Sequence, residues 1–248
     1  MPRFFMENID REPGEPLSIM GQDAQHISKS LRMKAGEKLT VCGGLEYDLL
    51  CEITGIYDDR VELTVAEKTF TESEPSVTVT LYQGVPKGNK LELIIEKTIE
   101  LGVSRIVPVL MQRSVSRPDA KSAAKKHERY GKQAVSAAKQ CGRGIIPEVG
   151  EMLIFREMIE QLKRHQAVLF FYECGGEPLS SVMEKISGEG WRDIAMVIGP
   201  EGGFDPAEAQ ALREAGAFTA TLGKRILRTE TAPIAALAAI MYATGNMD

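Results

Sequence analysis

The stretch from Ala195 to Gly203 constrains the fold more than any other part of the chain. It reads AMVIGPEGG, so that an apolar run of strand length ends abruptly in Gly199-Pro200-Glu201-Gly202-Gly203. Asp205 follows, with Pro206 at the first helical position and Glu208 three residues after the aspartate, which is the pattern of a capped helix start. The sequence therefore predicts a strand, a loop with few side chains and a helix.

Two other predicted strands end in a similar way. Residues 167–172 lead into Glu173 and two glycines, and residues 217–222 lead into Gly223 and a polar turn. Because the carboxyl ends of parallel strands meet at one edge of a sheet, we expect the three turns to converge into one pocket. The glycine turn matches neither the dinucleotide fingerprint nor the P-loop, so alone it could serve a phosphate, an adenosine-type cofactor or a plain tight connection.

The remaining patterns predict two domains in an α/β protein. After a helix over 23–32, alternating patterns at 39–42, 47–56 and 60–66 predict strands of a small barrel or half-barrel. Segment 71–75 has no periodicity and is predicted to be a linker, which gives domains 1–72 and 76–248. In the second domain strands alternate with helices, which favours a mostly parallel sheet. Further strands are expected at 77–82 and 105–110, and helices at 90–100, 121–140, 180–186 and 233–244.

Charge is distributed unevenly along the chain. The net charge is -5, yet residues 113–143 hold nine Lys and Arg against two Asp and Glu. Such a stripe can hold the phosphates of a nucleic acid on an otherwise acidic molecule, although a run of charge is more often a solvated helix face.

Several classes of protein are disfavoured. The longest apolar run, 232–243, is shorter than the roughly 20 residues that span a bilayer, and the start of the chain does not read as a signal peptide. The four cysteines and three histidines lack metal-ligand spacing. We therefore expect a cytoplasmic protein without a membrane anchor, a metal site or a disulfide framework.

The motifs resemble those of a known family. Residues 198–204 (IGPEGGF) and 225–232 (RILRTETA) are similar to the signature of the SPOUT methyltransferases of the RsmE type, which methylate N3 of a uridine in 16S ribosomal RNA. Asp205 and Ser30 are mild departures from the family pattern. The resemblance extends along the chain through Pro2–Phe5, His26–Arg32, Lys87–Gly102, Arg113-Ser114 and Gln140–Arg143.

The resemblance implies a fold that the residue patterns do not indicate. It implies a SPOUT domain with a deep trefoil knot, in which the chain from Ala195 onward is threaded through an earlier loop, and connections do not usually thread. It also implies a PUA-like, RNA-binding β-barrel domain over 1–72, a methyltransferase domain over 76–248 and a homodimer. The apolar helix at 233–244 is expected to be both buried in the core and part of the dimer interface.

The cofactor implied by the resemblance is S-adenosyl-L-methionine, and the implied partner is 16S rRNA in the small ribosomal subunit. The glycines would let the backbone approach the adenosine closely, and Tyr172 and Glu173 would lie at the rim near the ribose. The other cofactor-binding positions carried over are Ile198, Gly199, Pro200, Glu201, Gly202, Gly203, Leu222, Gly223, Leu227, Thr231 and Ala232.

Methylation of uracil N3 requires that this nitrogen lose its proton. Arg228 is the candidate cation that would stabilise the uracil anion, and Glu230 is the weaker candidate for proton acceptor, because an adjacent arginine lowers the pKa of a carboxylate. A structural salt bridge is the alternative for both. The expected RNA contacts, each of which could instead be ordinary surface charge, are Arg3, Arg32, Lys87, Lys90, Arg113 and Arg143.

Two other functions fit parts of the sequence. A non-catalytic RNA-binding or ribosome-assembly protein of the same architecture would keep the fold without the activity, and tight binding of S-adenosylmethionine would argue against it. A metabolic α/β enzyme with another adenosine cofactor would leave the first domain and the basic stripe unexplained.

Overall fold

A computed structural model describes residues 1–6, 9–44 and 47–247. The chain divides into two compact units, one formed by Met1–Glu74 with Ala138–Ile146 and the other by Pro75–Ala137 with Pro147–Asp248. The sequence patterns placed Ala138–Ile146 in the second domain. In the structure this segment is held by the first unit, because the Glu74 carboxylate accepts hydrogen bonds from Arg143 and from the main-chain N–H groups of Gly144 (3.0 Å) and Ile145 (3.2 Å).

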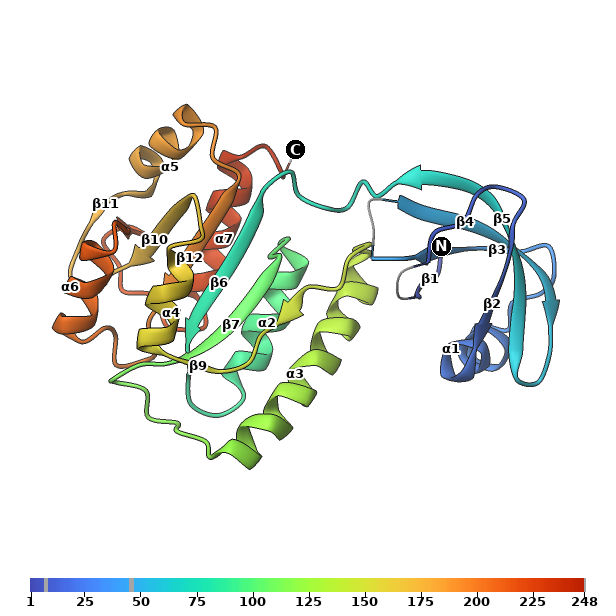
Figure 1. Ribbon diagram of the computed structural model, residues 1–248, viewed down its shortest axis with the longest axis horizontal. Coiled ribbons are helices and arrows are strands. Elements are labelled where there is room, and N and C mark those ends of the chain that lie inside the picture. The colour runs from blue at the N-terminus through green and yellow to red at the C-terminus, as the bar shows by residue number, and fades with distance from the viewer. Residues whose placement is uncertain (7–8, 45–46, 248) are drawn as a thin grey trace. The chain divides into compact units, whose positions relative to one another are not determined.

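The first unit contains a five-stranded sheet in the order β1-β3-β4-β5-β2 (Figure 1). Strand β1 is parallel to β3 and the other pairs are antiparallel. Alternate residues of the long strands are buried, as expected for a sheet with one face on the core. In the described part of the chain β1 and β2 do not pair with each other, and the PUA-like barrel stays a prediction. The strands are β1 (Arg3–Phe5), β2 (Pro16–Met20), β3 (Lys38–Cys42), β4 (Tyr47–Ile56) and β5 (Arg60–Phe70).

The helix expected over 23–32 is present, but it covers residues 21–30 and changes its type part-way. The structure has a short α1 (Gly21–Gln25) that continues as one π-helical turn, His26–Ser30, in which the Leu31 N–H donates to the His26 carbonyl oxygen at 2.9 Å. Arg32 then adopts a left-handed conformation with φ of 54°, which a helix does not continue through.

The second unit is built on an eight-stranded sheet in which all the strand pairs of the described residues are parallel. The order is β11-β13-β10-β12-β6-β7-β8, and β9 pairs with β7. The prediction of a mostly parallel sheet is confirmed. The strands are β6 (Thr78–Gly84), β7 (Arg105–Leu110), β8 (Glu148–Val149), β9 (Leu153–Ile154), β10 (Ala167–Phe171), β11 (Glu177–Pro178), β12 (Asp193–Ile198) and β13 (Phe218–Thr221).

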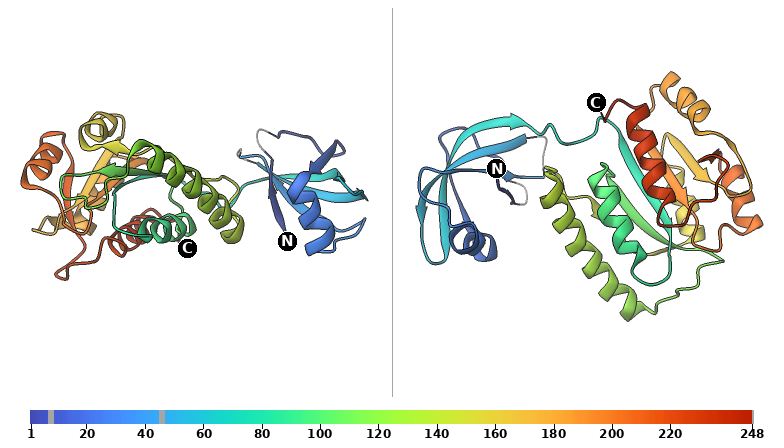
Figure 2. Two further views of the ribbon diagram at one scale, coloured as in Figure 1. Left: turned by 90° about the horizontal axis from the view of Figure 1, so that it is seen from below. Right: turned by 180° about the vertical axis from the view of Figure 1, so that it is seen from behind.

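Helices cover both faces of this sheet (Figure 2). On one face α2 contacts α7, which also contacts α5, and on the other face α4 contacts α6. Strand β10 (AVLFF) is buried along its whole length, as expected for a central parallel strand. The helices are α2 (Lys90–Glu100), α3 (Ala120–Cys141), α4 (Phe155–Leu162), α5 (Leu179–Gly188), α6 (Pro206–Glu214) and α7 (Ala232–Ala243).

Local signals set several of these boundaries. Helix α6 begins at Pro206, as predicted, because the Asp205 carboxylate accepts from the Ala207 N–H at 3.0 Å and the Glu208 carboxylate accepts from the Asp205 N–H at 3.1 Å. Helix α7 buries Leu237 and Ile240, so that its expected place in the core is confirmed. No helix of the described residues is both long and apolar enough to cross a membrane.

Candidate functional site

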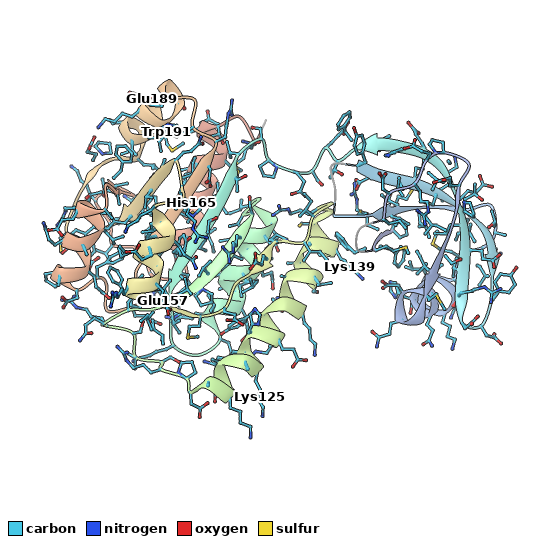
Figure 3. The ribbon with its side chains drawn as sticks, viewed as in Figure 1. Lys125, Lys139, Glu157, His165, Glu189 and Trp191 are labelled. Carbon is cyan, nitrogen blue, oxygen red and sulfur yellow. The ribbon has the colours of Figure 1, made fainter. Side chains whose placement is uncertain are left out.

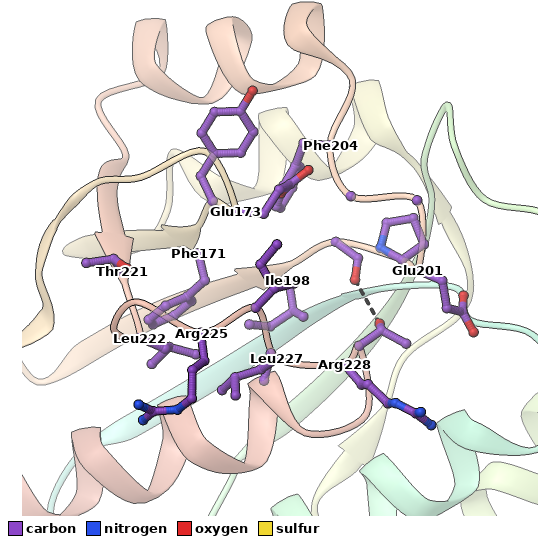
Figure 4. Close-up of a pocket in the computed structure, with 18 of the residues that line it drawn as sticks. Phe171, Glu173, Ile198, Glu201, Phe204, Thr221, Leu222, Arg225, Leu227 and Arg228 are labelled. Atoms are coloured by element: carbon purple, nitrogen blue, oxygen red, sulfur yellow. Dashed lines mark hydrogen bonds between the residues drawn. The ribbon is translucent and has the colours of Figure 1, made fainter.

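Three parallel strand ends lie in register at one edge of the second unit's sheet. Phe171 at the end of β10 pairs with Ile198 of β12 on one side and with Ala220 of β13 on the other. The turns that follow the three strands surround a cavity of about 570 Å³ (Figure 4). The prediction that these turns converge into one pocket is therefore confirmed.

One wall of this cavity is apolar. Phe171 and Ile198 at the ends of β10 and β12, and Leu222 and Leu227 from the loop before α7, converge on one region of it (Figure 4). Phe204 lies at its edge with 1% of its surface exposed, and its ring packs edge-on against Phe170 at 5.7 Å between centroids. The apolar wall gives the cavity the character of a small-molecule site.

At two positions of the loop 199–203, neighbouring side chains leave no room for a residue larger than glycine. Gly203 has φ of 68°, and a Cβ at this position would overlap the Glu173 carboxylate. A Cβ on Gly202 would lie 3.0 Å from the Cβ of Arg113. The absence of side chains at Gly202 and Gly203 thus makes room for Arg113 and Glu173. The sequence suggested a different reason, namely that these glycines let the backbone approach an adenosine.

A buried chain of hydrogen bonds ties the two main loops of the cavity together. Gln83, fully buried at the end of β6, donates from its Nε2 to Thr229 Oγ1 at 3.1 Å, and this hydroxyl donates to the Gly199 carbonyl oxygen at 2.8 Å (Figure 4). The loop before α7 is thereby fastened to the end of β12. Sequence reasoning missed Gln83 and Thr229, although Thr229 lies inside the RILRTETA motif.

A lysine and two carboxylates form a second link at the mouth of the cavity. Lys90 Nζ lies 3.0 Å from Glu201 Oε1 and 3.1 Å from Glu230 Oε2. Burial alone would raise the pKa of both carboxyls, but hydrogen bonds from main-chain N–H groups and pairing with Lys90 hold each pKa below its usual range. Both glutamates are therefore ionised at neutral pH.

The loop between β13 and α7 presents polar groups without a protein partner. Residues 224–227 make no main-chain hydrogen bond to any other described residue. Arg225 and Arg228 are exposed, and their side chains extend in different directions at the cavity mouth (Figure 4). No described residue forms a salt bridge or hydrogen bond with the Arg228 guanidinium, although its charge contributes to the lowered pKa of Glu230.

Comparison with known proteins places this site in a family. Residues 72–241 match the RNA methyltransferase domain family. Ribosomal RNA small subunit methyltransferase E of Bacillus subtilis is 35% identical over 251 residues, which are 98% of this chain and 97% of the relative. The chain belongs to the ribosomal RNA small subunit methyltransferase E family.

Solved structures of similar proteins contain the cofactor that the sequence suggested. The enzyme of this name from Neisseria gonorrhoeae, bound to S-adenosyl methionine, is 30% identical with a TM-score of 0.86, and the match covers 98% of this chain and 97% of that one. A putative methyltransferase from Legionella pneumophila with bound SAM is 28% identical with a TM-score of 0.81, covering 97% of each chain.

Most of the residues that this methyltransferase family suggested for the cofactor line the cavity. Tyr172, Glu173, all residues from Ile198 to Gly203, Leu222, Gly223, Leu227 and Ala232 do so, whereas Thr231 does not. Glu230 lies outside the cavity lining and is paired with Lys90. Sequence reasoning missed other lining residues, which are Phe171, Phe204, Ala220, Thr221, Lys224, Arg225 and Ile226.

The cationic residues expected to contact RNA differ in their exposure and in the protein groups that already pair with them. Arg143 was expected to contact RNA, but its side chain is only 5% exposed and is paired with Glu74, so it has no surface to present. Arg3 donates to Asp48 at 2.6 Å. Arg113 is 42% exposed and donates to the Gly202 carbonyl oxygen at 3.1 Å, and Arg32 and Lys87 are exposed.

The basic stripe is also less positive than its sequence suggests. Acidic partners neutralise Arg129, Lys132 and Lys139 as well as Arg143, through Glu92, Glu128, Asp23 and Glu74. Lys125 projects from the start of α3 without an ion pair to any described residue (Figure 3). In the described part of the chain no group of His, Cys, Asp and Glu side chains could hold a metal ion.

Proposed function

We propose that the protein methylates N3 of a uridine in 16S ribosomal RNA, with S-adenosyl-L-methionine as the methyl donor. The family and the cofactor-bound relatives support an S-adenosylmethionine-dependent methyltransferase of small-subunit rRNA. The choice of N3 comes from the resemblance of residues 198–204 and 225–232 to the family signature. The observation that carries the site is the cavity at three strand ends, with an exposed Arg228 at its mouth that no described residue pairs.

The cavity has the groups that an adenosine needs. The N–H and C=O groups of residues 224–227, which the described chain leaves unpaired, can read the edge of an adenine, and Leu222 and Leu227 can pack on its faces. The Glu173 carboxylate at the rim suits the two hydroxyls of a ribose. When bound, S-adenosylmethionine supplies a methyl group on a positively charged sulfur.

The chain's own residues have two tasks in this reaction. The two loops hold the acceptor nitrogen in line with the methyl carbon and sulfur, which is the main contribution to a displacement of this kind. Arg228 stabilises the negative charge that spreads over the uracil oxygens once N3 has lost its proton. Glu230 remains the weaker candidate for proton acceptor, because its lowered pKa makes it a poor base.

The larger architecture also belongs to this proposal. We infer a SPOUT domain with a trefoil knot built on the second unit, a PUA-like RNA-binding domain built on the first unit, and a homodimer in the cytoplasm to which α7 contributes an interface. The threading is supported by Thr229, which bonds to both Gln83 and Gly199 and so draws the last loop across the end of β12. Tyr242, 73% exposed on α7, supports a partner on that helix.

Four of the expected cations remain as proposed RNA contacts, which are Arg3, Arg32, Lys87 and Arg113. Phosphate contacts of this kind predict that RNA affinity falls steeply with salt. They position the RNA and do not choose the uridine.

The test is methylation of undermodified small subunits and of naked rRNA with labelled cofactor, followed by nucleoside mass spectrometry. The expected product is N3-methyluridine at one position. Another methylated nucleoside would overturn the choice of atom and leave the methyltransferase standing. Binding of both ligands without any product would favour the non-catalytic assembly protein.

A further inference from the structure

Lys90 was expected to contact RNA, but the structure gives it a different neighbourhood. It is the first residue of α2, and its ammonium lies between two carboxylates from the two loops of the cavity. We propose that Lys90 is a positioning residue that holds these loops together so that they bind S-adenosylmethionine. This inference rests on the proposed function of the same cavity.

The three side chains are well placed for such a link. The side chains of Lys90, Glu201 and Glu230 are 34%, 27% and 18% exposed, so the cluster is only partly screened by water. Glu201 also accepts from the Lys87 N–H at 3.1 Å, which fixes its carboxylate at the start of α2. One ammonium thus joins the glycine loop, the loop before α7 and a helix end.

The ion pairs of Lys90 act together with the buried hydrogen bond between Thr229 and Gly199. Thr229 directly precedes Glu230 and Gly199 lies two residues before Glu201, and the hydrogen bond between Thr229 and Gly199 joins the same two loops inside the cavity. Lys90 fastens them at the mouth. Without its ammonium, the two ionised carboxylates would face each other with no cation between them, and their repulsion would push the loops apart.

The same arrangement argues against a phosphate contact. A lysine between two carboxylates carries a charge that is more than compensated by its neighbours, so the cluster as a whole is negative. An RNA phosphate would meet repulsion from Glu201 and Glu230 before it reached the ammonium.

The experiment compares binding of S-adenosylmethionine to the full-length protein by isothermal titration calorimetry. In Lys90→Met we expect the dissociation constant for the cofactor to rise about five- to tenfold. Lys90→Arg should keep most of the affinity, since it keeps the cation. Glu201→Gln added to Lys90→Met should recover part of the loss, because it removes one of the two repelling charges.

Helix α2 offers a matched control. Lys97 also lies between two carboxylates, 2.8 Å from both Glu96 and Glu100, with 38% of its side chain exposed, but it is not part of the cavity. Lys97→Met should leave cofactor affinity unchanged. This control separates a link between loops from a general effect of removing a paired lysine.

The outcomes are distinguishable. Unchanged cofactor affinity in Lys90→Met, or no recovery from Glu201→Gln, would overturn the inference. An unchanged cofactor dissociation constant with a raised KM for rRNA would instead restore the RNA contact expected from the sequence. If the wild-type protein itself failed to bind S-adenosylmethionine, the proposed function would fail and not merely the role of Lys90.

Discussion

At position 203, both the backbone conformation and a neighbouring side chain require glycine. Its φ of 68° disfavours any side chain, and the Glu173 carboxylate occupies the place of a Cβ. We expect Gly203→Ala to lower both stability and cofactor affinity, because Glu173 must move away from the rim. Thermal unfolding and calorimetric titration with S-adenosylmethionine would measure the two effects.

Gly190 provides the control for this substitution. It has the same φ of 68°, but no described atom lies within 4 Å of the place that a Cβ would occupy, so that an alanine there meets only backbone strain. Gly190→Ala should therefore cost about 1 kcal/mol of stability and leave cofactor affinity unchanged. Equal loss of affinity in both variants would contradict the role given to the contact with Glu173.

Arg228 carries the chemical part of the proposed function. Since its guanidinium is exposed at the cavity mouth and has no ion pair within the described chain, Arg228→Ala should lower the single-turnover rate about 100-fold at saturating RNA and cofactor. Cofactor affinity should change little, and Arg228→Lys should keep part of the rate. A wild-type single-turnover rate in Arg228→Ala would contradict the role of Arg228 in stabilising the uracil anion.

The cysteines should differ sharply in reactivity. Burial, followed by the nearby charge of Asp48, raises the pKa of the Cys42 thiol to about 12, and burial raises the pKa of Cys51 to about 11. Cys174 is exposed. We expect iodoacetamide at about pH 8, near the ordinary pKa of a free thiol, to label Cys174 in the folded protein and to spare Cys42 and Cys51, as read by peptide mass spectrometry. Rapid labelling of Cys42 would show that its strand opens.

At the scale of elements, the loop before α7 depends on one hydroxyl. Thr229→Val keeps the shape of the side chain but removes the donor to the Gly199 carbonyl oxygen and one of the two acceptors of Gln83 Nε2, which keeps its hydrogen bond to the Gly84 carbonyl oxygen. We expect a loss of about 1–3 kcal/mol in the free energy of unfolding and weaker cofactor binding. Denaturant titration and calorimetry would measure them.

Thr98 is the matched control for the hydroxyl of Thr229. It is fully buried, and its hydroxyl donates at 2.7 Å to the Ile94 carbonyl within the same helix. Because that carbonyl keeps its helical partner, Thr98→Val should cost less than Thr229→Val and should not affect the cofactor. A larger loss of stability in Thr98→Val than in Thr229→Val would mean that the hydrogen bonds of Thr229 between the two loops contribute little to stability.

The sequence predicted the elements whose residues carry a local signal. Asp205 and Glu208 mark the start of α6, and the apolar strand ends before Gly199 and Gly223 mark the pocket. It missed β1, β2 and α4, and it missed the two-residue strands β8, β9 and β11, because two residues are too few to show a period. It gave no sign of the pairs that Lys90 forms with Glu201 and Arg143 with Glu74, because an acidic partner 69 or more residues away in sequence leaves no local pattern.

At the scale of the whole molecule, Glu74 and Arg143 join segments that are far apart in the chain. Glu74→Gln removes the carboxylate charge that pairs with a guanidinium of only 5% exposure, so we expect the free energy of unfolding of the first unit to fall by about 3 kcal/mol. Limited proteolysis between residues 138 and 146, together with denaturant titration, would detect the loss.

Glu72→Gln is the control for this variant, because Glu72 is exposed two residues away. It should leave stability and the cleavage pattern unchanged. Combining Glu74→Gln with Arg143→Met should recover part of the stability, since the guanidinium that pairs with Glu74 is then also removed. A double variant as unstable as the single one would indicate that the carboxylate acts mainly through the main chain of Gly144 and Ile145.

The place of Ala138–Ile146 has a consequence for the order of synthesis. The first unit begins at Met1, yet the arginine that pairs with Glu74 is added 69 residues later. In a nascent chain that ends at Glu74, this carboxylate therefore lacks the groups that bind it in the folded protein, because they have not yet been synthesised. The amino-terminal unit is complete only after much of the other unit's sequence has already been made.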